Sequence, residues 1–141
     1  MNEAAGAYIR GDLRHYCSLF DHGDDYTLMP PFGGETRHGF EFTEERAAEV
    51  ASFFTSGEAE LDLQKSYFSG DLAVLVAVER QHGVVGGSPD QDWSLRVTLV
   101  FRRIGDRWEI VHRHADPLVR EIPWSLFMAI ARGVESSDPP D

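Results

Sequence analysis

The spacing of apolar residues changes once along this chain, and this change constrains the fold more than any other feature. Before residue 57, apolar side chains recur every third or fourth residue, as in Leu13, Tyr16 and Phe20, which is typical of amphipathic helices. From Ala59 onward they recur at every second residue, which predicts strands. Strands joined in sequence by short turns form an antiparallel meander, so the pattern predicts an α+β domain with its helices first. The predicted strands cover residues 59–68, 71–83, 93–103 and 107–115.

Three helices are predicted ahead of the strands, each from residues that can begin or end it. The Ala-rich first ten residues form a helix that ends at Gly11, and Asp12 is placed to cap the next helix. Thr43 is placed to cap a third helix, which Gly57 is expected to end. The predicted core stripe of that third helix is Ala47, Val50, Ala51 and Phe54.

Length and composition fit one domain. A chain of 141 residues with 42% apolar residues is long enough to bury a single core. We therefore treat residues 1–141 as a single domain, with its core over about 4–118. An apolar C-terminal helix is predicted at about 123–132, and a frayed tail at 136–141.

The charge of the chain argues against two classes of partner. The net charge of -11 disfavours nucleic acid and anionic membranes, because both are bound through clustered cations. The single cysteine, Cys17, excludes an intrachain disulfide, and it falls on an apolar helix stripe where an inert thiol is expected. No apolar run is long enough to span a membrane, and no signal peptide is recognisable, so we expect a cytoplasmic protein.

Both faces of the predicted sheet carry apolar residues. The alternation of side chains along a strand, taken alone, places one row of apolar residues in the core and residues such as Arg96 on the opposite face of the sheet. That other face is too apolar to be fully exposed to solvent. The sequence therefore predicts that helices cover one face of the sheet and a second subunit covers the other. The apolar row consists of Trp93, Leu95, Val97, Leu99 and Phe101.

Three local motifs, in this order and spacing, resemble the nuclear transport factor 2-like superfamily. They are Arg10-Gly11-Asp12, the segment Phe32–Gly39 and the segment Gly105–His114. The chain is most similar to the SnoaL-like and ketosteroid-isomerase-like branches, and its last motif is also similar to the association (hub) domain of calcium/calmodulin-dependent kinases. The resemblance implies an α+β roll, in which a cone-shaped, curved antiparallel sheet wraps around the N-terminal helices and a pocket opens at one end.

The register of that family implies which side chains line the pocket. It turns the row from Trp93 to Phe101 outward, where relatives bury it against a second subunit, so a homodimer is expected. The implied lining residues are Val76, Val78, Arg80, Arg96, Thr98, Val100, Val111, Arg113 and Ala115.

Steroid isomerase activity is not expected from the residues present. That reaction needs a carboxylate base and two acidic hydrogen-bond donors. The matching positions hold Pro30, Ala4 and Thr98, which supply none of these groups.

The arginines of the strands leave two interpretations open. Arg80, Arg96 and Arg113 could form a wall that binds a small organic anion. Alternatively they are structural, with Arg113 paired to Glu109 at the rim of the cone. His38, in the loop before the third helix, is a weak candidate for an acid or base, and a solvated loop histidine is the favoured interpretation.

We expect no metal and no cofactor. His112, His114 and Asp116 have the spacing of ligands on one strand face, but no fourth ligand is evident. The leading hypothesis is a SnoaL-like domain that binds a small molecule, with a carboxylate as the expected ligand. The alternatives are an isomerase, cyclase or dehydratase of the same fold, and a protein-association module without a ligand.

Overall fold

The computed structural model describes residues 2–133; Met1 and residues 134–141, including the predicted tail at 136–141, lie outside the described part. The helices are α1 (Asn2–Ile9), α2 (Leu13–Leu19), α3 (Glu44–Phe53) and α4 (Trp124–Arg132). The strands are β1 (Asp21–Met29), β2 (Arg37–His38), β3 (Phe54–Ser69), β4 (Leu72–Val85), β5 (Gln91–Asp92), β6 (Leu95–Ile104) and β7 (Arg107–Asp116).

The strands form one mixed sheet. Their order is β2-β1-β7-β6-β4-β3, and β5 pairs with β4 away from this path. β3, β4, β6 and β7 are antiparallel neighbours in that succession, which confirms the predicted meander. β1 runs parallel to β7 and so joins the start of the chain to the end of the meander.

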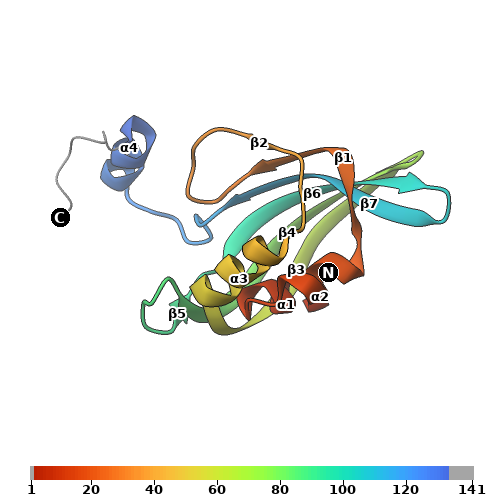
Figure 1. The fold of residues 1–141 in the computed structure, drawn as a ribbon. Helices are drawn as coiled ribbons and strands as arrows, with labels where there is room; N and C mark the ends of the chain where they lie inside the picture. Colours follow the sequence, from red (N-terminus) through yellow and green to blue (C-terminus); the bar gives the residue numbers. More distant parts are fainter. Residues whose placement is uncertain (1, 134–141) are drawn as a thin grey trace.

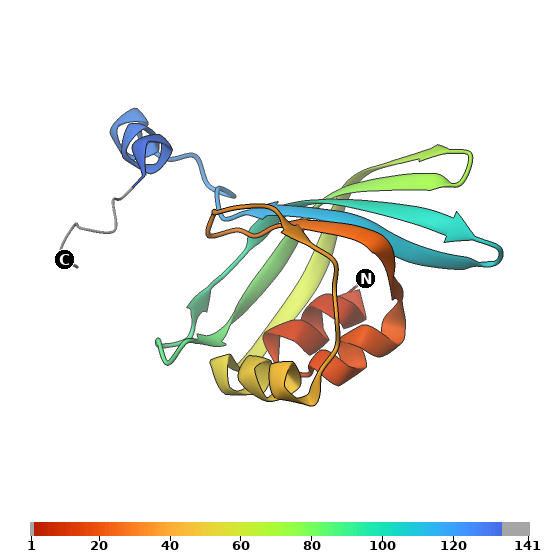
Figure 2. The ribbon, with the colours of Figure 1, turned by 45° about the horizontal axis from the view of Figure 1, so that its top comes forward.

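The sheet curves around the three N-terminal helices, which lie against one of its faces (Figures 1 and 2). α1 packs on β3 and β4, and Phe20, just after α2, contacts Phe101 of β6 with 6.1 Å between ring centroids. The core between helices and sheet contains Tyr26, Ala73, Ala77, Val97, Leu99, Phe101, Ile110 and Ala115. The expected α+β fold, with a curved sheet wrapped around helices, is confirmed.

Two of the predicted helix caps are present. The Asp12 carboxylate accepts a hydrogen bond from the backbone N–H of His15 at 3.1 Å, at the start of α2. The Thr43 hydroxyl accepts one from the backbone N–H of Arg46 at 3.0 Å, at the start of α3. Each cap satisfies a backbone donor that the first turn of a helix leaves free.

The prediction that Gly57 ends the third helix is wrong. α3 stops at Phe53, and Gly57 lies within β3, opposite Gly83 of β4. A Cβ at Gly57 would lie 2.5 Å from the His82 carbonyl oxygen and 2.6 Å from Cγ1 of Ile9. The glycine is therefore needed for the close approach of β3, β4 and α1, and it does not act as a helix cap.

The face assignment taken from the resemblance is wrong for β4 and β6, although it holds for Arg113 and Ala115 of β7. Residues paired across adjacent strands share a face, and Ala77, Val97 and Ala115 are paired across β4, β6 and β7. These three are buried on the helix-covered face, where Leu99 is 0% exposed. The row from Leu95 to Phe101 is thus inside the protein, as alternation alone predicted, and is not available for a subunit contact. A register offset of one residue turns every side chain of a strand to the other face, which explains the error.

α4 stands apart from the rest of the chain in both views (Figures 1 and 2). Its apolar side chains are exposed, with Trp124 the most exposed at 70%. The others are Leu126, Phe127, Met128 and Ile130. Within residues 2–133, no helix is long and apolar enough to cross a membrane.

Candidate functional site

The structure separates the sequence-predicted pocket residues onto the two faces of the sheet. Arg113 pairs with Leu99 and therefore lies on the helix-covered face. Arg96 pairs with Val78, and Arg80 follows two residues after Val78, so both arginines lie on the uncovered face. Val76, Thr98 and Val100 share that uncovered face, and Val111 is the unpaired residue of a bulge in β7.

The arginines of the uncovered face are each paired with a carboxylate. Arg80 Nη2 lies 3.2 Å from Asp62 Oδ2, and Arg96 Nε lies 2.8 Å from Asp116 Oδ1. Arg80 also lines a cleft of about 460 Å³ at one end of this face, together with Asp92.

Arg113 forms the buried ion pair of the interior. Its Nη1 donates to Glu79 Oε1 at 2.6 Å and its Nη2 donates to Oε2 at 2.9 Å. Burial alone would lower the pKa of the Arg113 guanidinium, but the Glu79 carboxylate outweighs it and raises that pKa. The expected partner, Glu109, instead accepts from Arg102, because the bulge at Val111 changes the register of the strand before it.

Three tyrosines lie near enough to this ion pair for the charge of Arg113 to act on them, and together with it they form what we call the tyrosine cluster. Tyr8 comes from α1, Tyr16 from α2 and Tyr26 from β1. Burial raises the pKa of all three phenols, and the positive charge of Arg113 opposes that shift in each. Each protonated phenol carries one O–H group that can donate a hydrogen bond.

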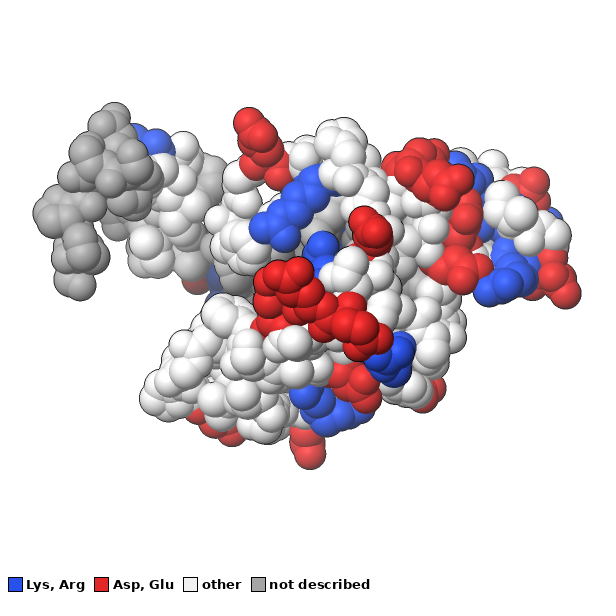
Figure 3. Space-filling model, in the orientation of Figure 1, with Lys and Arg blue, Asp and Glu red and all other residues white. Residues whose placement is uncertain are grey.

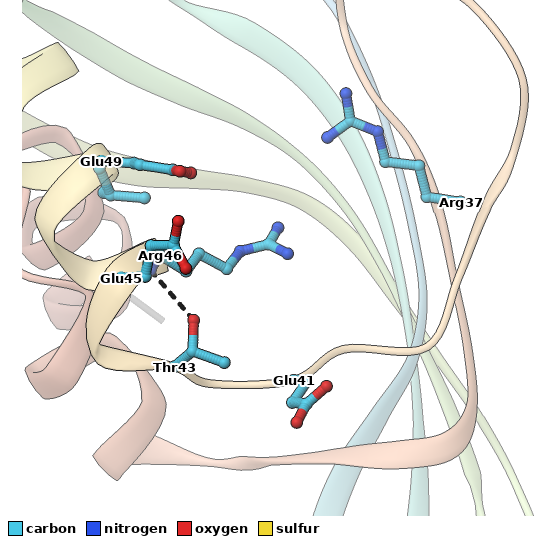
Figure 4. Close-up of a pocket in the computed structure, with 7 residues that line it drawn as sticks. Arg37, Glu41, Thr43, Glu45, Arg46 and Glu49 are labelled. Atoms are coloured by element: carbon cyan, nitrogen blue, oxygen red, sulfur yellow. Dashed lines mark hydrogen bonds between the residues drawn. The ribbon is translucent and has the colours of Figure 1, made fainter.

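A cleft of about 490 Å³ opens between α3 and the segment that carries β2. We call it the mouth cleft. In Figure 4, Arg46 extends from α3 and Arg37 from β2, and both guanidinium groups point into the space between. Figure 3 shows acidic side chains gathered over α3, with basic side chains between them and the β2 segment. The lining residues are Arg37, Glu41, Thr43, Glu45, Arg46, Glu49 and Val50.

Arg46 connects the mouth cleft to the interior. The guanidinium carbon of this half-buried side chain lies 5.4 Å from the centre of the Phe40 ring. Its charge also reaches the interior, since it opposes the burial-driven rise in the pKa of Tyr8 and Tyr26. Within the described part of the chain, no carboxylate lies in ion-pair distance of Arg46.

The remaining candidates do not assemble a catalytic or metal centre. His38 is exposed in β2, where it pairs with Thr27 of β1. His112 Nδ1 lies 2.8 Å from the Thr27 hydroxyl, and Asp116 is held by Arg96. Across residues 2–133, no group of His, Cys, Asp and Glu side chains has the arrangement of a metal site. Burial raises the pKa of the Cys17 thiol, which disfavours its nucleophilic form.

Sequence reasoning missed Arg46 and His22. Arg46 lies four residues before Val50, one turn along the predicted core stripe, so its position on the inner side of α3 could have been read from the spacing. His22 lies in the first half of β1, where the run of acidic residues and glycine between Phe20 and Tyr26 shows no alternation that would indicate a strand.

Comparison with known proteins places this fold in a family. The sequence matches the SnoaL-like domain over residues 1–119. Among curated proteins, none matches the chain.

Solved structures with the same fold differ in their described roles. A protein of the NTF2-like family from Streptomyces avermitilis, labelled a dehydratase, is 25% identical, with a TM-score of 0.63 over 84% of this chain and 90% of its own. The S. rosetta CaMKII hub is 18% identical, with a TM-score of 0.61 over 78% of this chain and 85% of its own. An NTF2-like superfamily protein from Salmonella enterica is 19% identical, with a TM-score of 0.67 over 85% of this chain and 87% of its own.

The family match covers most of the chain, and the curved sheet, the enclosed helices and the solved relatives agree with it. The chain therefore belongs to the SnoaL-like domain family.

Proposed function

We propose that this domain binds a small organic anion, such as a carboxylate on an apolar body, at the mouth cleft with the tyrosine cluster beneath. The observation that carries the proposal is Arg46. It is half-buried, lies against Phe40 and has no carboxylate partner among the described residues. A guanidinium that has lost part of its hydration without gaining a counter-charge is costly, and a bound anion would offset that cost.

The glutamates of the mouth cleft do not remove this argument. Glu41, Glu45 and Glu49 are exposed, so water screens their charges. Arg37 faces Arg46 across the cleft and lies over Phe32, with 5.4 Å between its guanidinium carbon and the ring centre. Two cations beside aromatic rings suit an acid whose body is apolar.

The proposal places the anion at different arginines from those first predicted. Arg80, Arg96 and Arg113 each have a carboxylate partner, and only Arg113 lies under the helices. The present proposal replaces the sequence-based prediction that Arg80 and Arg96 bind the anion. Both lie on the other face of the sheet, so they serve as controls for Arg46.

A calorimetric titration tests the proposal. The probes are benzoate and cyclohexanecarboxylate, with benzamide and benzylamine as neutral and cationic analogues. We expect the acids to bind better than their analogues, and Arg46→Gln to weaken acid binding about tenfold or more, as for one lost charge-assisted hydrogen bond. Arg80→Ala and Arg96→Ala should leave acid binding unchanged. Equal binding of benzoate and benzamide, or no effect of Arg46→Gln, would contradict the proposal.

The relative labelled a dehydratase favours a second candidate, an enzyme of the dehydratase type. Such a reaction needs a proton donor for the leaving hydroxyl and a base for the substrate proton. The tyrosine cluster supplies donors, since phenols are protonated at neutral pH and burial raises the pKa of these three further. Loss of water from a hydroxy acid that wild-type protein catalyses and Tyr16→Phe does not would support this candidate, and absence of turnover in wild type would count against it.

We also propose that the chain forms a homodimer through the uncovered sheet face. Val76 is 36% exposed there, and Val74, Val78 and Val100 are half-buried beside it. The uncovered face thus takes the place of the row from Leu95 to Phe101 as the expected contact surface of the dimer. Sedimentation should show a dimer at micromolar concentration and a monomer for Val76→Arg; a monomeric wild type would refute it.

A further inference from the structure

His22 holds the one buried side-chain nitrogen or oxygen in residues 2–133 that has no hydrogen-bond partner, its Nε2 atom. The ring is held in place by aromatic neighbours. It stacks on Phe40 with 3.9 Å between centroids and an angle of 11°, and it meets the ring of Tyr26 edge-on at 4.8 Å. Tyr16 and Phe20 complete the surroundings, at 5.9 and 5.5 Å.

These surroundings suit phenylalanine better than histidine. A buried polar atom without a partner loses its hydration and gains nothing in return, which typically destabilises a fold by about 1–3 kcal/mol. Buried polar atoms are nearly always paired, so an unpaired one calls for a partner that comes from outside the chain.

His22 adjoins the mouth cleft through one shared ring. Phe40 contacts His22 by stacking, and Arg46 of the cleft lies over the same Phe40 ring at 5.4 Å. Arg46 is also close enough for its charge to act on His22. Burial first, and the Arg46 charge second, lower the pKa of His22 to about 4.

A neutral imidazole selects a particular kind of partner. At neutral pH His22 carries one N–H donor and one lone pair, so Nε2 can pair with a hydroxyl or a carbonyl oxygen. It offers no positive charge to a second carboxylate. A hydroxyl or a carbonyl oxygen of the bound molecule would therefore satisfy Nε2.

We propose that the ligand is a hydroxy acid or keto acid with an apolar body, whose carboxylate binds Arg46 and whose hydroxyl or carbonyl oxygen pairs with Nε2 of His22. The inference rests on the proposed function of the mouth cleft and specifies its ligand. Phe40 must move to admit the oxygen, because Nε2 is buried. Phe40 follows Gly39, whose N–H donates to the Tyr26 carbonyl oxygen at 2.7 Å, so the Phe40 side chain has to move while the backbone before it stays in place.

The test compares acids that differ only in the distal oxygen. The probes are benzoate against 3- and 4-hydroxybenzoate, and cyclohexanecarboxylate against 4-oxocyclohexanecarboxylate, titrated calorimetrically into the full chain. We expect wild type to bind at least one oxygenated acid roughly three- to tenfold more tightly than its parent, as for one neutral hydrogen bond. His22→Phe should abolish this preference while the affinity for the parent acid stays the same.

A second measurement needs no variant. In protein with ¹⁵N-labelled histidine, the ring nitrogen resonances of His22 should shift on addition of the preferred oxygenated acid and not on addition of its parent. Equal binding of oxygenated and parent acids by wild type, or a preference that persists in His22→Phe, would overturn the inference.

Failure of the proposed anion site would give a different set of binding results from failure of the inference about His22. If none of the acids binds, or if Arg46→Gln leaves the binding of benzoate unchanged, the proposed anion site is wrong and this inference falls with it. If the parent acids bind through Arg46 and only the oxygen preference is missing, the anion site stands and His22 has no part in it.

Discussion

The Arg113 guanidinium and the Glu79 carboxylate meet in a two-pronged ion pair that reaches from β7 to β4 across β6, with bonds of 2.6 and 2.9 Å. The side chain of Glu79 is only 7% exposed and that of Arg113 is 20% exposed. Neither charge can be removed alone without leaving the other in a site with little water.

We therefore predict that Glu79→Gln destabilises the fold by about 3–5 kcal/mol, because it leaves Arg113 buried without a counter-charge. The double variant Glu79→Leu with Arg113→Leu should be destabilised less than Glu79→Gln, since no charge remains. Urea unfolding measures both. For comparison, Arg80→Ala breaks the exposed pair with Asp62 and should change stability by no more than about 1 kcal/mol. An equal loss of stability in Glu79→Gln and Arg80→Ala would contradict the prediction that the Glu79 carboxylate balances a buried charge.

His22 should make stability depend on pH. Its pKa is about 4 in the folded state and 6.5 is its ordinary value, so between these the unfolded chain binds the proton more readily. The free energy of unfolding should therefore fall as the pH is lowered from about 6.5 towards 4. His22→Phe should reduce this slope and also raise stability at pH 7.

The comparison with His22→Phe isolates this contribution from that of His82. Hydrogen bonding to Asp90, with a further contribution from Glu58, raises the pKa of His82, which acts in the opposite direction and is common to both proteins. Identical slopes for wild type and His22→Phe would show that His22 is not buried as described.

The cap of α3 should affect both stability and binding. Thr43→Ala removes the hydroxyl that accepts the Arg46 N–H, which should destabilise the protein by about 0.5–2 kcal/mol. Because the first turn of α3 carries Arg46, we also expect weaker binding of benzoate. Thr43→Ser keeps the hydroxyl and should restore both properties; loss of binding in Thr43→Ser as well would argue against the cap as the cause.

Gly83 should not tolerate a side chain. A Cβ there would lie 2.3 Å from the Ser56 carbonyl oxygen, so Gly83→Ala must force β3 away from β4, at a cost of about 1–3 kcal/mol. Gly6→Ala is the matched control, because its Cβ would meet only the end of the flexible Arg10 side chain, and alanine favours a helix. Thermal unfolding should separate the two by several degrees, with Gly83→Ala the less stable.

The apolar side chains of α4 should add little to the stability of an isolated chain. Phe127 is 42% exposed and Ile130 is 53% exposed, and α4 has no substantial contact with the sheet. Phe127→Ser should therefore change the free energy of unfolding by less than about 0.5 kcal/mol when measured on dilute protein. A loss above 2 kcal/mol would mean that α4 is buried in the species present in solution.

Helix starts and strand order could be predicted from the sequence because they depend on local chemistry. Asp12 and Thr43 cap the helices they were expected to cap, and the period-two stretch forms the expected meander. Gly57 misled the prediction because a glycine at a close strand contact and a glycine at a helix end look alike in sequence.

The candidate site could be predicted less well, because it depends on contacts between distant segments. Alternation placed Leu99 inside correctly, whereas the register carried over from relatives turned it outward. The pairing of Arg113 with Glu79 in place of Glu109 follows from a strand bulge, which leaves no periodic signal in the sequence. The spacing places Arg46 on the inner side of α3, but it does not tell which acidic side chains lie near its guanidinium. An arginine-rich site was expected, yet which arginines lack a partner is decided by tertiary structure.

The parallel contact between β1 and β7 has a consequence for synthesis on the ribosome. Thr27 and His112 are joined by a side-chain hydrogen bond across 85 positions of sequence. β1 leaves the ribosome early and has to wait, unpaired along this edge, until nearly all of the matched SnoaL-like region has been made. Such distant pairings slow folding and leave strand edges open to wrong partners in the meantime. The last strand of the meander thus sets the earliest moment at which the nascent chain can complete its fold.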